Sequence, residues 1–313
     1  MKTTDFLNRA REQVQRRYQN HEIAYRTYYN TQSHLRSFEQ FNRRTSGHQM
    51  DESLIKEYKA WLRLQGNSTA TINQKLIPIL NMMGKEYSHL YEGNRPHRYG
   101  DISSKEADRE RIRYLTGKQL GALVSLWRRE KPGKTRDAME LFLFSFHACG
   151  LRLSDIVTLE WSHINRREAT LTKRMVKTKT LVTIPLSAPA LEILSRWEGR
   201  HQRFVFGLLP ENFDLSDDPS LSQAIDRCGW SLRARLGPIG RYLDLTFPLG
   251  MHMARHTFAV MALNDAHVSV HLISRLLGHT SVVVTEKVYA TFLLPTLSQE
   301  VRNHLSFEEF RAV

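Results

Sequence analysis

The sequence predicts a mainly α-helical protein with one small antiparallel β-sheet, an α+β fold, divided into two domains. Apolar residues recur at helical spacing along most of the chain, whereas only residues 169–186 are β-branched and alternating. With 313 residues, 41% of them hydrophobic, the chain can bury two moderate cores. A charged stretch with Gly and Pro, residues 93–110, lacks a sustained apolar period and reads as a linker. We therefore expect an N-terminal domain over residues 1–106 and a C-terminal domain over residues 112–313.

Composition favours a polyanionic partner. The chain holds 45 Lys and Arg against 32 Asp and Glu, a formal net charge of +13, and its pI is near 9.9. Cys149 and Cys228 form no CxxC pair, which indicates a reducing cytosol. The N-terminus lacks the apolar core of a signal peptide, and apolar runs such as residues 141–144 are too short for a bilayer. We expect neither secretion nor membrane insertion.

The first domain is expected to consist of binding and packing helices. Residues 1–50 carry nine Lys and Arg against four Asp and Glu, interleaved with tyrosines. Such a mixture can grip a phosphate backbone, or it can be the solvated face of ordinary helices. Apolar residues at helical spacing over residues 54–62 predict a helix, and Ser68 or Thr69 can cap another over residues 72–80. The tyrosines are Tyr18, Tyr25, Tyr28 and Tyr29.

Two helices are expected to open the second domain. Thr116 and Gln119 form a capping box, and an apolar helical face continues to Trp127. Residues 138–148 are apolar nearly all round, which is typical of a central buried helix, and Gly150 would end it.

A tight connection follows this buried helix. Ser154 can cap the next helix, over residues 155–161. Arg152 then lies between two helices, where its long side chain can reach into a cleft. Asp155 is near enough to orient that guanidinium.

Residues 169–186 predict a strand pair with a polar turn around residues 177–180. Lys177 would lie at or near the tip, where a lysine is usually just solvated. After Ser187 a helical pattern resumes through Trp197, and it recurs beyond the loop near residues 210–219.

The strongest local signal is HMARHTFAV at residues 252–260. On a helix, His252 and Arg255 share a face, so an imidazole and a guanidinium can hold one phosphate together. His256 lies one turn from His252, which also fits a zinc pair. Met253 occupies the position where a metalloprotease helix needs its glutamate, so a buried structural histidine is the default reading of His256.

The last helix signals surround a histidine and a tyrosine. Ser269 can cap a helix that Gly278 ends, His279 follows directly, and Tyr289 lies on a short amphipathic segment. A tyrosine in such a segment is most often packing. Its basic companions change the reading, because cations around an anionic phosphate would help a phenol, whose free pKa is about 10, to attack it.

Taken in order, GLRLSDIVTLEW, VKTKTLVTIPL, HMARHTFAV and LLGHTSVVVTEKVYA resemble the tyrosine recombinase, or phage integrase, family over about residues 116–291. The N-terminal helices resemble the core-binding domain of that family, and the rest resembles its catalytic domain. The resemblance implies that Tyr289 is the nucleophile and that Arg152 and Arg255 clamp the scissile phosphate. It gives supporting roles to His252 and His279.

The resemblance also makes Lys177 the general acid toward the leaving 5′ hydroxyl, with Lys179 as a competitor because the hairpin register is open. Asp155 and His256 would hold these catalytic residues in place without contacting the phosphate themselves. One departure from the family pattern is that ten positions separate His279 from Tyr289, where nine are more common. No cofactor and no metal are expected.

The implied function is site-specific recombination of DNA through a covalent 3′-phosphotyrosine, for the integration, excision or inversion of a mobile element. The expected partner is duplex DNA at specific sites, bound by four protomers, with a DNA-bending or directionality factor as a conceivable helper. The implied location is a bacterial cytoplasm, with the enzyme at the nucleoid when bound to DNA. The tail, residues 292–313, could dock on a neighbouring protomer or on its own subunit. The alternatives are a type IB-like topoisomerase and a non-catalytic DNA-binding accessory protein.

Overall fold

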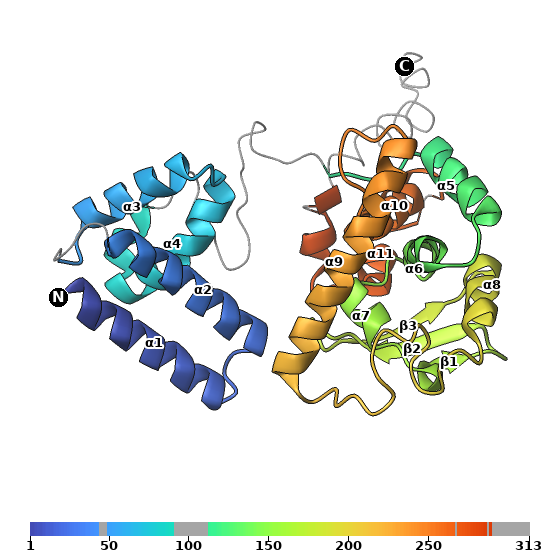
Figure 1. Cartoon of the computed structure of the whole chain (residues 1–313), viewed down its shortest axis with the longest axis horizontal. Helices are drawn as coiled ribbons and strands as arrows, with labels where there is room; N and C mark the ends of the chain where they lie inside the picture. Colours follow the sequence, from blue (N-terminus) through green and yellow to red (C-terminus); the bar gives the residue numbers. More distant parts are fainter. Residues whose placement is uncertain (44–48, 91–111, 267, 287, 290–313) are drawn as a thin grey trace, which may run out of the picture. The chain divides into compact units, whose positions relative to one another are not determined.

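The computed structural model describes residues 1–43, 49–90, 112–266, 268–286 and 288–289. The chain divides into two compact units, each described on its own (Figure 1). Unit 1 comprises Met1–Glu110 with Asp217–Ser222, and unit 2 comprises Arg111–Ser216 with Gln223–Val313. The linker expected over residues 93–110 and the tail, residues 292–313, lie outside the described residues.

Unit 1 is helical. Its elements are α1 (Thr3–Gln19), α2 (Tyr25–Asn42), α3 (Glu52–Leu64), α4 (Thr69–Met83) and the 3-10 helix η1 (Lys85–Leu90). Helix α2 packs against α1, α3 and α4, and the buried side chains between them form one apolar core. Ser68 accepts a hydrogen bond from the Thr71 amide, which confirms it as the cap of α4.

The tyrosines of unit 1 lie against one another. The rings of Tyr18 and Tyr28 stack with their centroids 4.8 Å apart, and Tyr25 contacts both. Tyr28 donates its hydroxyl hydrogen to Gln15. These rings therefore brace α1 against α2, and of the four only Tyr29 is among the markedly exposed large side chains, at 45%.

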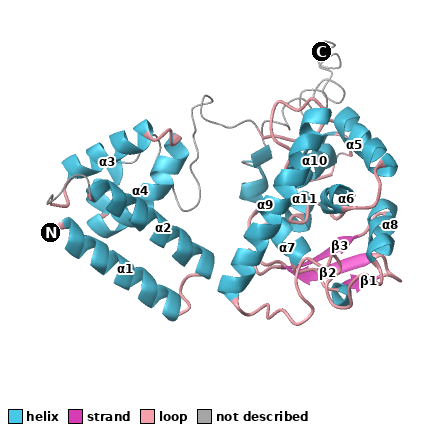
Figure 2. Ribbon diagram, viewed as in Figure 1, coloured by secondary structure: helices cyan, strands magenta, loops and turns pink. Residues whose placement is uncertain are grey.

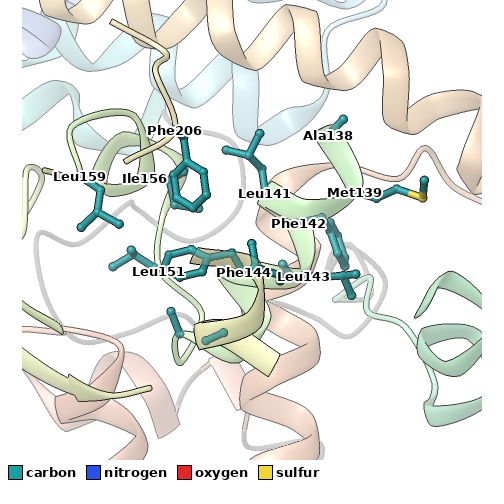
Figure 3. Packing of buried hydrophobic residues seen from close by; sticks show 14 of the residues in the cluster. Ala138, Met139, Leu141, Phe142, Leu143, Phe144, Leu151, Ile156, Leu159 and Phe206 are labelled. Carbon is teal, nitrogen blue, oxygen red and sulfur yellow. The ribbon is translucent and has the colours of Figure 1, made fainter. Parts of the chain in front are cut away.

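Unit 2 is built around a central helix, α6 (Lys134–His147). The other helices that lie wholly or mostly in unit 2 are α5 (Gly117–Arg129), α7 (Leu153–Val157), the 3-10 helix η3 (Trp161–His163), α8 (Ala188–Trp197), α9 (Asp218–Tyr242, whose first turn belongs to unit 1), α10 (Met251–Asn264) and α11 (Val270–Leu276). The Thr116–Gln119 capping box at the start of α5 is confirmed. Helix α6 packs against α5, α8 and α10, and its residues from Ala138 to Ser145 are all buried (Figure 3).

A buried carboxylate fastens three of these helices together. Glu140 on α6 is 1% exposed, and it accepts hydrogen bonds from the indole nitrogens of Trp127 on α5 and Trp197 on α8 at 3.1 and 2.7 Å. Arg136 donates to the same carboxylate at 3.3 Å. A buried charge is tolerated when it is paired and hydrogen-bonded in this way.

The small sheet has the order β1-β2-β3 and is antiparallel (Figure 2). Strands β2 (Thr170–Arg174) and β3 (Leu181–Pro185) form the expected pair, with Thr172 opposite Thr183. Strand β1 (Ile164–Asn165) adds a third member that was not expected, because two residues are too few to show an alternating pattern. The predicted fold class, mainly α with a small antiparallel sheet, is confirmed.

One helix start was predicted wrongly. Arg152, not Ser154, occupies the N-cap position of α7, and that helix ends at Val157 instead of continuing to residue 161. Beyond it, Glu160 pairs with Phe204 in an isolated bridge, which draws the chain into extended backbone. Within the described residues we find no helix whose length and apolarity would carry it across a bilayer.

Candidate active site

Helix α10 brings the central residues of the site together. Arg255 is 4% exposed, whereas His252 is exposed one turn earlier, at the open end of the helix. Since residues three and four apart share a helix face, His252, Arg255 and His256 form one cluster, and the rings of the two histidines meet edge to face with centroids 4.5 Å apart. The predicted placement of this segment on a helix is confirmed.

The Arg255 guanidinium joins three parts of the chain. Nη1 donates to the carbonyl of Gly150 at 2.9 Å, and Nη2 donates to the carbonyl of Leu277 at 2.8 Å and to Nε2 of His279 at 2.8 Å. Gly150 has a φ of +76°, and a Cβ there would lie 3.0 Å from the side chains of both Arg255 and Leu277. This close approach requires glycine.

Arg152 reaches the same carbonyl from another direction. As the residue before α7 it has extended backbone, and its Nη1 lies 3.4 Å from the carbonyl oxygen of Leu277. Arg152 and Arg255 thus meet at one oxygen atom, although 103 positions separate them in the sequence (255 − 152). Neither guanidinium forms an ion pair with a carboxylate in the described part of the chain.

Burial and neighbouring positive charges lower the pKa values of basic residues in this site. Burial lowers the pKa of Arg152 and of Arg255, and the neighbouring Arg152 charge lowers that of Arg255 further. Burial also lowers the pKa of His279 to about 4, with added effects from Arg255, Arg152 and Lys177. Positive charges that lie this close together favour the binding of an anion at the site.

Asp155 is the nearest acid, and it has a different task from the one expected. It is 0% exposed, and its Oδ1 accepts the Val176 amide at 2.7 Å, so its direct partner is the β2–β3 hairpin and not the Arg152 guanidinium. Its charge still acts on Arg152, Lys173 and Arg255 over longer distances, while burial raises its own pKa. Asp155 therefore ties the hairpin to α7.

Replacing Asp155 by Ala should release the hairpin, whereas Asn should not, because an Asn side-chain oxygen can still accept the Val176 amide. In Asp155→Ala we expect that amide to exchange its hydrogen about tenfold faster or more, and the free energy of unfolding to fall by about 1–3 kcal/mol. Site-resolved hydrogen exchange and urea unfolding measure both. Unchanged protection of Val176 in the Ala variant would contradict this role.

The hairpin tip carries the two lysines that competed for the general acid. Lys177 is exposed, and its charge contributes to the lowered pKa of both His252 and His279, behind burial and the two arginines. Lys179 has a left-handed backbone, φ 58°, and no corresponding effect on either histidine is found in the described structure. Its carbonyl instead accepts a hydrogen bond from Arg174 at 2.7 Å. Of the two lysines, Lys177 is therefore the one whose charge acts on the histidines of the site in the described structure.

His279 is held in one tautomer. Its Nε2 receives a hydrogen from Arg255, because a guanidinium only donates, so Nδ1 carries the ring hydrogen and donates it to Thr285 at 2.7 Å. Thr285 is fully buried on the helical segment of residues 282–286. The spacing of ten between His279 and Tyr289 thus still leaves His279 in the cluster.

Tyr289 is buried beside His256, within electrostatic reach of Arg152 and Arg255. Its side chain is 2% exposed, and its hydroxyl is 2.9 Å from Nδ1 of His256. Burial raises the pKa of Tyr289 to about 12, against the opposing effect of the Arg255 and Arg152 charges. The phenol is therefore protonated in the free protein, and its nearest polar neighbour is a histidine that the sequence indicated only as structural.

A cavity of about 540 Å³ opens beside the cluster. It lies between α9 and the start of α10, and its basic lining residues include Arg113, Arg152, Arg233, His252 and Arg255. Trp230, 75% exposed on α9, stands at the same cavity. Charged and aromatic groups together are the usual lining of a nucleic-acid site.

The structure places Arg152, His252, Arg255, His256, His279 and Tyr289 in one cluster, and the charges of Asp155 and Lys177 act on it without a direct hydrogen bond in the described structure. Sequence reasoning missed the Leu277 carbonyl, the Thr285 partner of His279, and Arg233 in the cavity. Backbone oxygens carry no residue-type signal, whereas the four arginines within residues 227–241 were a charge signal that could have been used. Among the described residues, no group of three or more His, Cys, Asp or Glu could hold a metal ion.

A buried phenol beside two arginines that have no carboxylate ion pair among the described residues, within a helical chain that has one small sheet, is the arrangement expected of a tyrosine-type site-specific recombinase. Residues 113–293 match the model of the phage integrase family, and residues 5–86 match the phage integrase SAM-like domain. The chain is a member of the phage integrase family, which confirms the resemblance found in its motifs.

Solved structures agree on the fold. The integrase of the Tn1549 transposon, in complex with transposon right end DNA, is 16% identical with a TM-score of 0.67, covering 98% of this chain and 100% of that one. A lambda integrase dimer bound to a COC′ core site is 17% identical with a TM-score of 0.60, covering 92% and 95%. A lambda integrase tetramer bound to a Holliday junction is also 17% identical with a TM-score of 0.60, covering 90% and 78%. No curated protein matches the chain.

Proposed function

We propose that this recombinase cuts and rejoins duplex DNA at specific sites through a covalent 3′-phosphotyrosine on Tyr289, and so integrates, excises or inverts a mobile element. The observation that carries the proposal is the pair Arg152 and Arg255, which meet at the Leu277 carbonyl within electrostatic reach of the Tyr289 phenol and have no carboxylate ion pair in the part of the chain that the structure describes. A phosphodiester supplies the missing anion.

Six residues of the site then have a part in the reaction: Arg152, Lys177, His252, Arg255, His279 and Tyr289. Arg152 and Arg255 bind the oxygens of the scissile phosphate, where negative charge grows in the transition state. His252 and His279 support them. The Tyr289 oxygen bonds to phosphorus while the bond to the 5′ oxygen breaks, and Lys177 gives that oxygen a proton.

Rejoining reverses these events. The phosphotyrosine conserves the energy of the phosphodiester, so a 5′ hydroxyl from a partner strand can displace Tyr289 without ATP. The proposed chemistry requires no cofactor and no metal, because the cations of the chain balance the charge on the phosphate.

Both domains have a role in this proposal. Residues 1–106 would be the core-binding domain and residues 112–313 the catalytic domain, with four protomers acting on two sites. The lambda integrase tetramer on a Holliday junction supports that number by analogy. The location would be a bacterial cytoplasm, with the enzyme at the nucleoid when bound.

Covalent capture in cells tests the proposal. Cells that express the protein are denatured rapidly, the DNA that stays attached is sequenced, and the attached peptide is identified by mass spectrometry. We expect sharp peaks at paired sites and a nucleotide on the peptide that contains Tyr289. Diffuse adducts would favour a topoisomerase, which a plasmid relaxation assay would confirm, and the absence of adducts would favour an accessory protein.

DNA binding by the cavity can be tested without knowing the target. Arg233→Ala should weaken binding to a duplex of arbitrary sequence and reduce the slope of log Kd against log salt concentration by about one, because one phosphate contact is lost. Arg196→Ala is the matched control, since Arg196 on α8 pairs with Glu192 at 2.8 Å. Equal slopes for the two variants would show that Arg233 on α9 does not contact a DNA phosphate.

A further inference from the structure

The Tyr289 hydroxyl is within hydrogen-bond distance of His256, a histidine that has no role in the reaction as proposed above. The distance from the phenol oxygen to Nδ1 of His256 is 2.9 Å, and the two rings lie at 66° with centroids 5.9 Å apart. A phenol that attacks phosphorus must lose its proton, and Lys177 gives a proton to the other oxygen. The proton of Tyr289 therefore needs an acceptor.

The two other histidines of the cluster are poor candidates for that role. His279 uses Nε2 to accept from Arg255 and Nδ1 to donate to Thr285, so it has no free lone pair. His252 is exposed at the cavity, and none of its hydrogen bonds in the described structure reaches Tyr289. His256 alone among these three lies at hydrogen-bond distance from the nucleophile.

We propose that His256 is a catalytic residue: its Nδ1 accepts the Tyr289 proton as the bond from oxygen to phosphorus forms, and returns it when Tyr289 leaves. This inference rests on the proposed function. In cleavage, the phenol O–H bond breaks and the proton moves to Nδ1, leaving an imidazolium. In rejoining, the 5′ hydroxyl returns its proton to Lys177 as its oxygen bonds to phosphorus, and the departing phenol oxygen recovers the proton held on His256.

The charges around His256 favour its protonation by Tyr289 only when the DNA phosphate is bound. Burial, and then the charges of His252 and Arg255, lower the pKa of His256 to about 4, so the ring is neutral and can accept. The phosphate brings negative charge beside those cations, which favours an imidazolium. The phenol also becomes far more acidic as its oxygen bonds to phosphorus, so a weak base suffices late in the attack.

The other ring nitrogen of His256 fits the same role. If Nδ1 accepts from Tyr289, Nε2 carries the hydrogen of the neutral ring. Nε2 has no hydrogen-bond partner in the described structure, yet it is not among the polar atoms sealed from solvent. Water can therefore serve it in both protonation states.

Two substitutions separate proton transfer from hydrogen bonding. The Oδ1 atom of Asn can replace Nδ1 as an acceptor but cannot take a proton, whereas Ala removes both. In single-turnover cleavage of a duplex that carries the captured site, we expect His256→Asn and His256→Ala each to be slower by about 10²-fold or more, with DNA affinity unchanged. His147→Asn, a half-buried histidine on α6, is the matched control and should stay within about threefold.

The pH profile provides a second measurement. The wild-type rate should fall about tenfold per pH unit below the pKa of His256 in the DNA complex, because the protonated ring cannot accept, and both His256 variants should lose that limb. Among the described residues, the charged or titratable groups that act on or contact His256 are His252 and Arg255 on α10 and Tyr289. A His256→Asn enzyme that cleaves at the wild-type rate would overturn the inference and reduce His256 to a positioning residue.

The tautomer of His256 can be measured on the free protein, without DNA. Nitrogen-15 NMR of His256 should show the tautomer with its hydrogen on Nε2, and a hydrogen on Nδ1 would overturn the inference. If the wild type forms no adduct at all, the proposed function fails and this inference fails with it. If the wild type forms adducts and His256→Asn does so equally fast, the inference alone fails.

Discussion

Tyr289→Phe should abolish covalent attachment to DNA while leaving DNA affinity unchanged. The substitution removes one oxygen atom from a side chain that is otherwise buried, so the catalytic unit keeps its shape and loses only the nucleophile. We expect cleavage to fall by at least about 10⁴-fold, as is typical when a nucleophile is removed. The hydrogen bond with His256 is lost as well, which should lower the free energy of unfolding by about 1 kcal/mol.

Gel-shift titration, adduct formation and urea unfolding measure these three quantities on one protein preparation. Tyr242→Phe is the matched control, because Tyr242 at the end of α9 is 62% exposed and its hydroxyl has no part in the site. Adducts that persist in Tyr289→Phe would show that another residue is the nucleophile. A loss of DNA affinity would show that the hydroxyl serves binding as well.

Arg255→Lys should reduce the cleavage rate by about 10²–10³-fold, although it keeps the positive charge. The guanidinium holds the carbonyls of Gly150 and Leu277 and the ring of His279, and in the proposed complex it must also contact the phosphate. An ammonium is a point charge without a planar fork and cannot face all of these groups. The expected loss is that of one good transition-state donor.

Single-turnover cleavage measures this effect, and lysine is a sharper test than alanine. Alanine would also leave the buried Gly150 carbonyl without its Arg255 donor and the Leu277 carbonyl with Arg152 alone, and it would lower the free energy of unfolding by about 1–3 kcal/mol. Arg200→Lys is the matched control, because Arg200 is exposed and pairs with Asp137 at 3.3 Å. A cleavage rate for Arg255→Lys within threefold of the wild type would remove Arg255 from the phosphate site.

Sequence patterns predicted the local structure of the site well where the signals were short-range. The capping box at Thr116, the Ser269 cap of α11 and the helical spacing of His252 and Arg255 all depend on residues within one turn of each other. Each appears in the structure as expected. The family resemblance supplied the roles of these residues, and the match to family models confirms the family.

What the sequence could not reveal depends on long-range contacts. The place of Arg152 in the cluster depends on a backbone oxygen at Leu277, and every residue type has that oxygen. The partner of Asp155 is likewise a backbone amide, at Val176. His256 read as a structural histidine because only the fold brings its Nδ1 to a hydroxyl 33 positions away.

The order of residues along the chain gives the Leu277 carbonyl a further importance. It receives Arg152, which precedes it by 125 positions, and Arg255, which precedes it by 22. During translation the earlier segments leave the ribosome first. Both arginines thus emerge before the oxygen on which they meet, and Tyr289 emerges after all of them. In the proposed mechanism, the nascent chain therefore gains its nucleophile only after both arginines and the Leu277 carbonyl have left the ribosome.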